Sequence, residues 1–430
     1  MKRIFACLLC VLLLAGCGAD VPGEVDQMVS IPEQMGLGAK SAAGEGSASF
    51  TLSTEWAEYD PSIGTVWFTL FNDSGREIET GVDHTLECYV EEAGAWYQVP
   101  LAEDTGWIAI ALSVPDGETI ALSCALSMFD YDFSGGGLFR IVKTVEGQAC
   151  TAEFRLTPGA AISADTPYGF ALLEDLPETY GAGTAAEDGC PAFTWAGAEN
   201  LSALRTFLEK VRLGIPCQLR TVQDYGENAP MVTDAIFANG HFQWQMRFQG
   251  TLYNQRFSYL VTDGTDIYFS NGADWETAQA NAGEWAVLAP PEGLQSGETA
   301  LVEDMTARRL AGSTARYKVW SADGIWSAAL TETPTEFSVG SQGRGEVFDL
   351  QSWDGLETAV TAIRWEEDGT LRLTCKTVTG ETSFLRFDPE AWELTSDPGV
   401  LPGQTSDHDT VEDLWGAGGA LRVFLFCAEK

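Results

Sequence analysis

Residues 66–75 have the sequence VWFTLFNDSG, and this stretch sets the pattern for the first part of the chain. Its apolar residues Val66, Phe68 and Leu70 stand at every second position, a period typical of a strand with one buried face. The letters NDSG that follow are residue types that form tight turns. The stretch therefore predicts a strand that ends in a turn, as in an antiparallel sheet.

The same alternation of short apolar runs and turn sequences continues on both sides of this stretch. HTLECYV, AWYQVP and TIALSCAL have the composition of strands, and EEAG and the pair Asp116 and Gly117 separate them. Short strands at this spacing are typical of a β-sandwich. We therefore predict a sandwich domain over residues 49–157.

The order of these motifs also resembles a known family. VWFTLFNDSG, HTLECYVEEAGAWYQVP, VPDGETIALSCAL, GGLFRIVKTVEG and CTAEFRL follow one another as in the bacterial immunoglobulin-like modules attached to many lipoproteins of Gram-positive bacteria. The resemblance implies an immunoglobulin-like spacer or adhesion-type module. It implies no active site.

The chain begins MKRIFACLLCVLLLAGC, which has a positive start, an apolar run and small residues before Cys17. This leader resembles the bacterial lipoprotein signal, and the resemblance implies cleavage after residue 16 and attachment of diacylglycerol to Cys17. A transmembrane anchor is the alternative, but the apolar run is far shorter than the roughly 20 residues that cross a bilayer. We expect a signal peptide at 1–16, a lipidated Cys17 with a flexible tether at 17–48, and an extracytoplasmic, membrane-anchored protein.

The composition limits the partners. The chain has 63 Asp and Glu against 24 Lys and Arg, a formal net charge of -39. Such a chain repels nucleic acid and anionic headgroups, so DNA and RNA are excluded as partners and the lipid is the expected contact with the membrane. The acidity gives only a mild bias toward neutral or cationic ligands.

Seven cysteines remain after the leader and the lipid site are set aside. They have no C-x-x-C or Cys/His spacing, so no zinc site is expected. Several stand in apolar strand-like runs, where a thiol acts as a small hydrophobe. Free, buried cysteines are therefore the favoured interpretation, with a disulfide framework as the alternative. The seven are Cys88, Cys124, Cys150, Cys190, Cys217, Cys375 and Cys427.

Residues 158–195 lose strand periodicity and are predicted to be a linker. A helix follows, with Asn200 as its N-cap and Gly214 just after its end, and then CQLRTV, MVTDAIF and FQWQMRF alternate as strands around the Asn239 and Gly240 turn. One helix packed on a curled antiparallel sheet is expected for 196–289. Part of this region, about 200–250, resembles a domain of unknown function in short secreted Gram-positive lipoproteins.

A Pro/Gly-rich joint at 290–299 precedes further strands, among them ARYKVW, TAVTAIRW, TLRLTCK and TSFLRFD. They predict an antiparallel β-rich domain at 300–430, closed by the last strand LRVFLFC. Whether 196–289 and 300–430 form one continuous sheet or two domains stays open. The overall prediction is a mainly β protein: an immunoglobulin-like sandwich followed by an antiparallel β-rich α+β region with one main helix.

Metal and catalytic motifs are weak. DYDFSGG places Asp130, Asp132 and Ser134 at alternating positions before a glycine, as in a calcium loop, but the twelfth position is Ile141 where an EF-hand needs Glu. An ordinary acidic turn is the favoured interpretation. The three histidines, His84, His241 and His408, have no ligand spacing, and neither GxSxG nor a phosphate-binding glycine loop is present. No cofactor is predicted.

Tryptophans could stack on sugars, and two of them stand beside turns. Trp275 in NGADWE and Trp353 in SWDG are the candidates for exposed platforms, with core packing as the favoured alternative. The leading functional hypothesis is a non-enzymatic binding or structural role at the cell envelope, with an envelope protein or a glycan as partner. The second is a carrier of an apolar ligand, since DIYFSNGADW and SFLRFDPEAWEL resemble one-helix open-barrel carriers. The third is an extracytoplasmic hydrolase.

Overall fold

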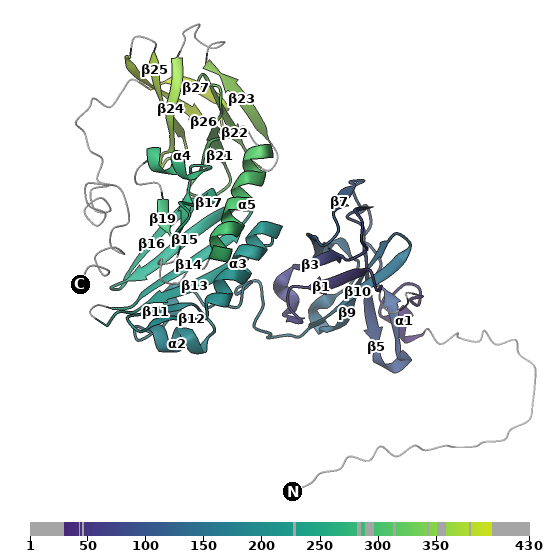
Figure 1. Ribbon diagram of the computed structural model, residues 1–430. Helices are drawn as coiled ribbons and strands as arrows, with labels where there is room; N and C mark the ends of the chain where they lie inside the picture. The colour runs from purple at the N-terminus through teal and green to yellow at the C-terminus, as the bar shows by residue number, and fades with distance from the viewer. Residues whose placement is uncertain are drawn as a thin grey trace, which may run out of the picture.

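The computed structural model describes residues 30–42, 44, 47–226, 229–281, 285–288, 296–312, 315–341, 344–350, 358–377 and 380–397. The fold is mainly β with antiparallel sheets and few helices, which confirms the predicted fold class. A β-sandwich forms the first part, and a larger β-rich part follows it, with two helices on the side that faces the sandwich (Figure 1). In the described part of the chain, no helix is long and apolar enough to cross a membrane.

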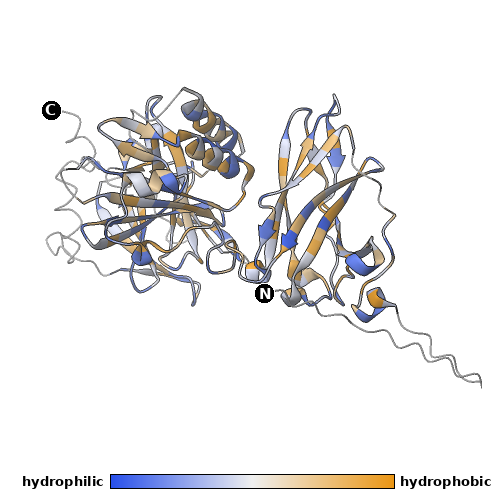
Figure 2. Ribbon diagram, turned by 90° about the horizontal axis from the view of Figure 1, so that it is seen from below, coloured by the Kyte–Doolittle hydropathy of each residue, from blue (hydrophilic) through white to orange (hydrophobic). Residues whose placement is uncertain are grey.

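The sandwich has a five-stranded sheet in the order β2-β10-β9-β5-β6, a three-stranded sheet in the order β1-β3-β8, and the pair β4-β7. Val66, Phe68 and Leu70 on β3 are fully buried, so the alternation read from the sequence faces the core as predicted. Figure 2 shows the same alternation of apolar and polar residues along the strands. The strands are β1 (Phe50–Thr54), β2 (Glu58–Tyr59), β3 (Thr65–Asn72), β4 (Ile78–Thr80), β5 (Thr85–Val90), β6 (Ala95–Gln98), β7 (Leu112–Val114), β8 (Thr119–Ala125), β9 (Gly137–Val145) and β10 (Gln148–Leu156).

Residues 30–41 were expected to belong to a flexible tether, and here the structure differs. The short helix α1 (Ile31–Gln34) begins with a capping box between Ser30 and Glu33, and Pro32 and Leu37 are buried. Backbone hydrogen bonds then join this segment to β6, including Gly38 N to Gln98 O at 2.8 Å. The segment covers the edge strand of the five-stranded sheet, because two apolar side chains and the free edge both gain a partner.

The predicted linker also contains structure. The 3-10 turn η5 (Leu173–Asp175), helix α2 (Ala182–Glu187) and strand β11 (Ala192–Thr194) lie within 158–195. Leu173, Tyr180 and Ala185 form a small core with Val222 and Val232 of the neighbouring sheet. The periodicity is lost because these elements are short, and burial of a few apolar residues holds them in place.

A buried ion pair of Arg220 joins the 158–195 segment to the sheet. The Arg220 guanidinium donates to both carboxylate oxygens of Asp234 at 2.7 Å and to the carbonyl oxygen of Ala171 at 2.6 Å. Both side chains of the pair are almost fully buried. Arg247 adds hydrogen bonds to the carbonyl oxygens of Leu173 and Pro177.

The larger part contains a six-stranded sheet in the order β12-β11-β13-β14-β15-β16, a three-stranded sheet and two four-stranded sheets. The Asn239 and Gly240 turn has positive φ at both residues, as the predicted two-residue hairpin requires. The strands are β12 (Gly197–Glu199), β13 (Cys217–Gln223), β14 (Met231–Ala238), β15 (His241–Phe248), β16 (Thr251–Phe257), β17 (Tyr259–Thr262), β18 (Ile267–Ser270), β19 (Trp285–Val287), β20 (Tyr317–Trp320), β21 (Ser327–Leu330), β22 (Glu336–Gly340), β23 (Gly345–Asp349), β24 (Thr358–Trp365), β25 (Leu371–Thr377), β26 (Thr382–Asp388) and β27 (Glu393–Ser396).

Helix α3 (Leu201–Leu213) is the predicted main helix, and Gly214 ends it with φ of 76° as expected. Asn200 does not cap it through its side chain; its amide donates instead to the carbonyl oxygens of Ala186 and Cys190. A second helix, α5 (Ser296–Gly312), is longer than α3 and was not predicted. Its apolar residues are few and scattered among acids and glycines, so the sequence lacks a continuous apolar stripe.

The buried pair of Arg220 and Asp234 yields the first prediction. Asp234→Ala leaves the Arg220 guanidinium buried without its carboxylate, which typically costs about 3–5 kcal/mol. Urea unfolding of the larger part, followed by tryptophan fluorescence, should show a loss of this size. Glu332→Ala is the matched control, because it breaks the exposed pair with Arg316 and should cost less than about 1 kcal/mol. Equal losses in the two variants would contradict the prediction.

Candidate functional site

The candidate site residues Cys17 and Trp353 lie outside the described part of the chain. The same holds for His408, Cys427 and the last predicted strand. The calcium candidates are described. Asp132 accepts a hydrogen bond from the backbone N–H of Ser134 at 3.0 Å and caps the 3-10 turn η4 (Phe133–Gly135). In the described residues no group of three His, Cys, Asp or Glu side chains could hold a metal ion, and the carboxylate of Asp132 serves the turn.

Trp275 begins helix α4 (Trp275–Ala280) and is half-buried. Its ring stacks on Tyr268 with 4.5 Å between ring centroids and 18° between ring planes. One face of the indole is therefore occupied by the protein. This arrangement agrees with the packing interpretation more than with an open platform.

The six cysteines in the described part of the chain are buried thiols, as the favoured interpretation predicted. Burial raises the pKa of the Cys124 thiol to about 12. A thiol that stays protonated is a poor nucleophile and a poor metal ligand. These cysteines act as small apolar residues of the cores.

The best candidate for a functional site lies between the sandwich and the larger part. Helices α3 and α5 face the outer side of the β1-β3-β8 sheet (Figure 1). Two cavities open along this boundary. Neither was predicted, because the walls of each come from several separate regions of the sequence and no local motif joins them.

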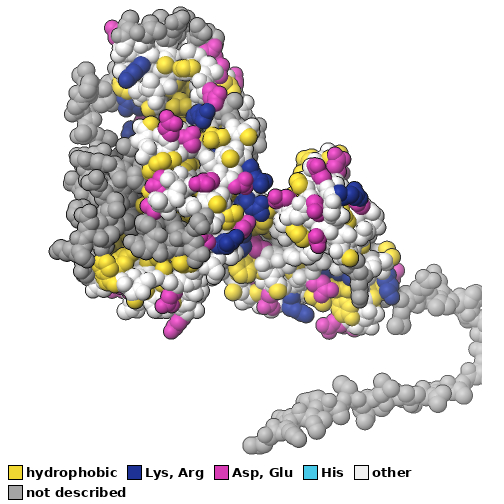
Figure 3. Space-filling view, viewed as in Figure 1, with side chains coloured by type: hydrophobic (Ala, Val, Ile, Leu, Met, Phe, Trp, Pro, Cys, Tyr) yellow, Lys and Arg dark blue, Asp and Glu magenta, His cyan; other side chains and the backbone are white. Residues whose placement is uncertain are grey.

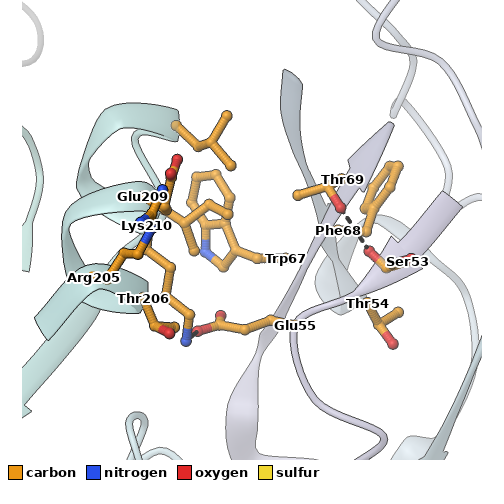
Figure 4. A pocket seen from close by; sticks show the side chains of 12 residues that line it. Ser53, Thr54, Glu55, Trp67, Phe68, Thr69, Arg205, Thr206, Glu209 and Lys210 are labelled. Carbon is orange, nitrogen blue, oxygen red and sulfur yellow. Dashed lines mark hydrogen bonds and ion pairs between the residues drawn. The ribbon is translucent and has the colours of Figure 1, made fainter. Parts of the chain in front are cut away.

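The smaller cavity, here called the α3 pocket, has a volume of about 380 Å³. Figure 4 shows Trp67 and Glu55 on the sandwich side and Arg205 and Lys210 on α3. Lys210 Nζ lies 2.8 Å from Glu55 Oε1 and 4.9 Å from the ring centre of Trp56. An ion pair and a cation–π contact thus close one side of the pocket.

The larger cavity, here called the domain groove, has a volume of about 840 Å³. Ligand sites commonly measure roughly 300–1,000 Å³, so the groove has the size of a small-molecule site. Its lining is mostly apolar. Side chains from the sandwich, from both helices and from the sheet take part: Leu112, Pro115, Ile120, Ala121, Val211, Leu213, Phe237, Phe242, Tyr259, Leu260 and Met305.

The charged groups of the domain groove are mainly basic. Arg212, Arg308 and Arg309 line it, and Glu118 is the one carboxylate among its described lining residues. Glu118 pairs with Arg212 at 3.3 Å and with Arg308 at 3.8 Å. Figure 3 shows Lys and Arg side chains gathered where the helices face the sandwich, on a surface otherwise rich in acids.

Arg309 is the most enclosed of the three arginines. Its guanidinium lies 4.4 Å from the ring centre of Tyr259 and donates to the carbonyl oxygen of Ala273. Burial lowers the pKa of its guanidinium, because a buried charge is poorly solvated. An apolar groove with a positive rim can hold a molecule that has an apolar body and an acidic group.

Comparison with known proteins identifies the sandwich. Residues 46–155 match the family of bacterial Ig-like domains. The class of the first domain is therefore the one that the order of its motifs predicted, and it indicates an extracellular or surface protein with a binding or structural role. The match covers about a quarter of the chain and leaves the larger part outside the family.

The similarity of this chain to solved structures is weak. A Bacteroides fragilis protein assigned as a 6-phosphogluconolactonase is 12% identical over 44% of this chain and 69% of that chain, with a TM-score of 0.20. A periplasmic gluconolactonase of Pseudomonas aeruginosa is 11% identical over 83% and 75%, with a TM-score of 0.16. Scores of this size carry no argument about fold or activity. No curated protein matches the chain.

His84 yields a second prediction, on the pH dependence of the sandwich. The ring is buried between Trp107, at 4.2 Å, and Phe68, at 5.1 Å. Burial lowers the pKa of His84 from 6.5 to about 4, while its hydrogen bond to the carbonyl oxygen of Val82 opposes the shift. Between these pH values the unfolded chain binds a proton that the folded chain does not. Stability is therefore highest above pH 6.5 and falls toward pH 4.

From pH 7 to pH 5 this one group should cost about 2 kcal/mol of sandwich stability. Hydrogen exchange of β3 peptides under mild urea measures that loss. His84→Gln should remove this part of the pH dependence, and His241→Gln, in the larger part, should leave it in place. An unchanged pH profile in His84→Gln would refute the assignment.

Proposed function

We propose that this protein is an extracytoplasmic, non-enzymatic binding protein, held at the membrane by a lipid on Cys17, that takes an amphipathic ligand in the domain groove. The groove is the observation that carries the proposal. Its floor reaches Phe237 and Phe242 of the buried core, and its rim has three arginines. The ligand would place an apolar body on the floor and an acidic group near Arg308 or Arg309.

Such a site agrees with both leading functional hypotheses, the binding role at the envelope and the carrier of an apolar ligand. A binding role at the envelope needs a surface outside the membrane, for which the Ig-like domain is a typical component. A ligand with an apolar body needs a place away from water, and burial contributes roughly 25 cal/mol per Å² of apolar area. The Ig-like domain then has two roles, since it is a spacer and also one wall of the groove.

The membrane anchor is tested first. Cys17→Ala removes the thiol that would carry diacylglycerol, so the protein should move from the membrane fraction to the soluble fraction in a bacterial host. Intact mass should show acyl chains on the unaltered protein and none on the variant. Cys10→Ala, within the leader, should leave both results unchanged. A wild-type protein that is soluble and has no acyl mass would end the anchoring proposal.

The groove is tested with the full chain carrying Cys17→Ala, which needs no detergent. The probe is 11-dansylaminoundecanoic acid, a fluorescent acid with an apolar chain. Ala121→Trp places a large ring in the groove from β8 and should weaken binding at least tenfold.

Ser123→Trp is the matched control. Ser123 stands two residues further along the same strand, is exposed and does not line the groove. The Ser123→Trp variant should bind the probe with an affinity within twofold of that of the parent. Binding that is absent from the parent, or equal in the two variants, would refute the groove as the ligand site.

A further inference from the structure

A second cluster of basic side chains lies on the larger part, on the face of the sheet opposite the hydrophobic core. Phe242 and Trp244 on β15 point into that core, so His241, one residue earlier, lies on the other face. Arg256 on β16 pairs in register with Gln243 and shares this face. Lys318 on β20 stands between the buried Tyr317 and Val319 and points away from their core.

These side chains contact one another directly. Arg256 Nη1 lies 3.0 Å from His241 Nε2, so the guanidinium donates to a neutral imidazole. The His241 ring lies 4.5 Å from the ring of Trp320, and Lys318 Nζ lies 4.4 Å from the centre of the same indole. Trp320 therefore holds His241 and Lys318 beside each other.

Among the described residues the cluster has a single interacting carboxylate, that of Asp323. Within the described residues neither Arg256 nor Lys318 forms an ion pair, although acids outnumber bases in the chain by 63 to 24. The acid that interacts with Arg256 is Asp323. Its Oδ1 already accepts hydrogen bonds from Ser321 Oγ at 2.5 Å and from the backbone N–H of Ile325 at 2.9 Å.

This shortage of counter-charge is unfavourable for the protein alone. Burial lowers the pKa of both Lys318 and Arg256, and the pKa of His241 is lowered by burial and by the two neighbouring positive charges. Burial is the largest cause of each shift, since a poorly solvated side chain disfavours its charged form. A bound anion would offset this poorly solvated positive charge.

The cluster is also fixed in position. Gly324 packs so closely on Arg256 that a Cβ there would lie 2.1 Å from Nη1. Gly324 has a positive φ, and the turn around it is held by the hydrogen bond from the Trp326 N–H to Ser321 Oγ at 2.9 Å. The guanidinium therefore has little freedom, and a preorganised donor loses little entropy on binding.

We propose that Arg256, Lys318 and His241 form a binding site for a phosphate group, separate from the domain groove. A guanidinium fork and an ammonium give several donors, which match the several acceptor oxygens of phosphate. The indole N–H of Trp320 is buried and has no acceptor among the described residues, so the cluster includes a further unsatisfied donor. The phosphate could be free or esterified, as in a glycerol phosphate.

The test uses the full chain carrying Cys17→Ala and two probes, inorganic phosphate and glycerol 3-phosphate, at constant ionic strength with chloride as the reference. Calorimetry gives the affinities. Lys318→Gln should weaken binding of the preferred probe at least tenfold. Lys376→Gln is the matched control, since it removes the same charge from an exposed position on β25, and it should bind within twofold of the parent.

A second readout does not depend on how a variant folds. In the parent protein, the imidazole NMR signals of His241 should shift when the probe is added, and those of His84 in the sandwich should not. Tighter binding of glycerol 3-phosphate would identify an esterified phosphate as the ligand, and tighter binding of inorganic phosphate would identify the free ion. An unmoved His241 signal, or equal losses in Lys318→Gln and Lys376→Gln, would overturn the proposal.

Discussion

The contact between Lys210 and Glu55 is the interaction on which the candidate site depends. It joins helix α3 to the outer face of the sandwich at 2.8 Å, and the two side chains are only 25% and 10% exposed. A pair enclosed in this way is screened less by salt than one on an open surface. The nearby indole of Trp56 adds a second contact to the same ammonium. Together with the pairs that Glu118 forms with Arg212 and Arg308, these contacts join the sandwich to α3 and α5, on either side of the α3 pocket and the domain groove.

The distribution of charge bears on both proposed binding sites. The chain is strongly acidic as a whole, which disfavours anions at long range. Five of its basic residues lie at two places: Arg212, Arg308 and Arg309 line the domain groove, and Arg256 and Lys318 belong to the cluster around Trp320. The dielectric constant near a protein surface is lower than in water, so a local group of cations can hold an anion even where the net charge opposes it. The mild bias toward cationic ligands drawn from composition therefore does not extend to these two sites.

The Ig-like domain forms part of the candidate site. Strand β8 of its three-stranded sheet supplies Ile120 and Ala121 to the domain groove, and strand β7 supplies Leu112. The covering of edge strand β6 by residues 38–41 also matters, since an open edge outside the cell would be available for pairing with other chains. One face of the domain thus contacts the rest of its own chain. Its edge strand β6 is covered and is not available for pairing with other chains.

The sequence by itself determined the secondary structure wherever a single period was sustained. Val66, Phe68 and Leu70 predicted β3, and the Asn239 and Gly240 turn predicted the hairpin of β14 and β15, because alternation and turn chemistry are local properties. It missed α5, whose apolar stripe is weak, and the short elements of 158–195, which are stabilised by Arg220 and by distant residues of the sheet. Both the domain groove and the Trp320 cluster were decided only by the tertiary structure. Their side chains lie far apart in the sequence, and packing between separate elements, which no local pattern records, brings them together.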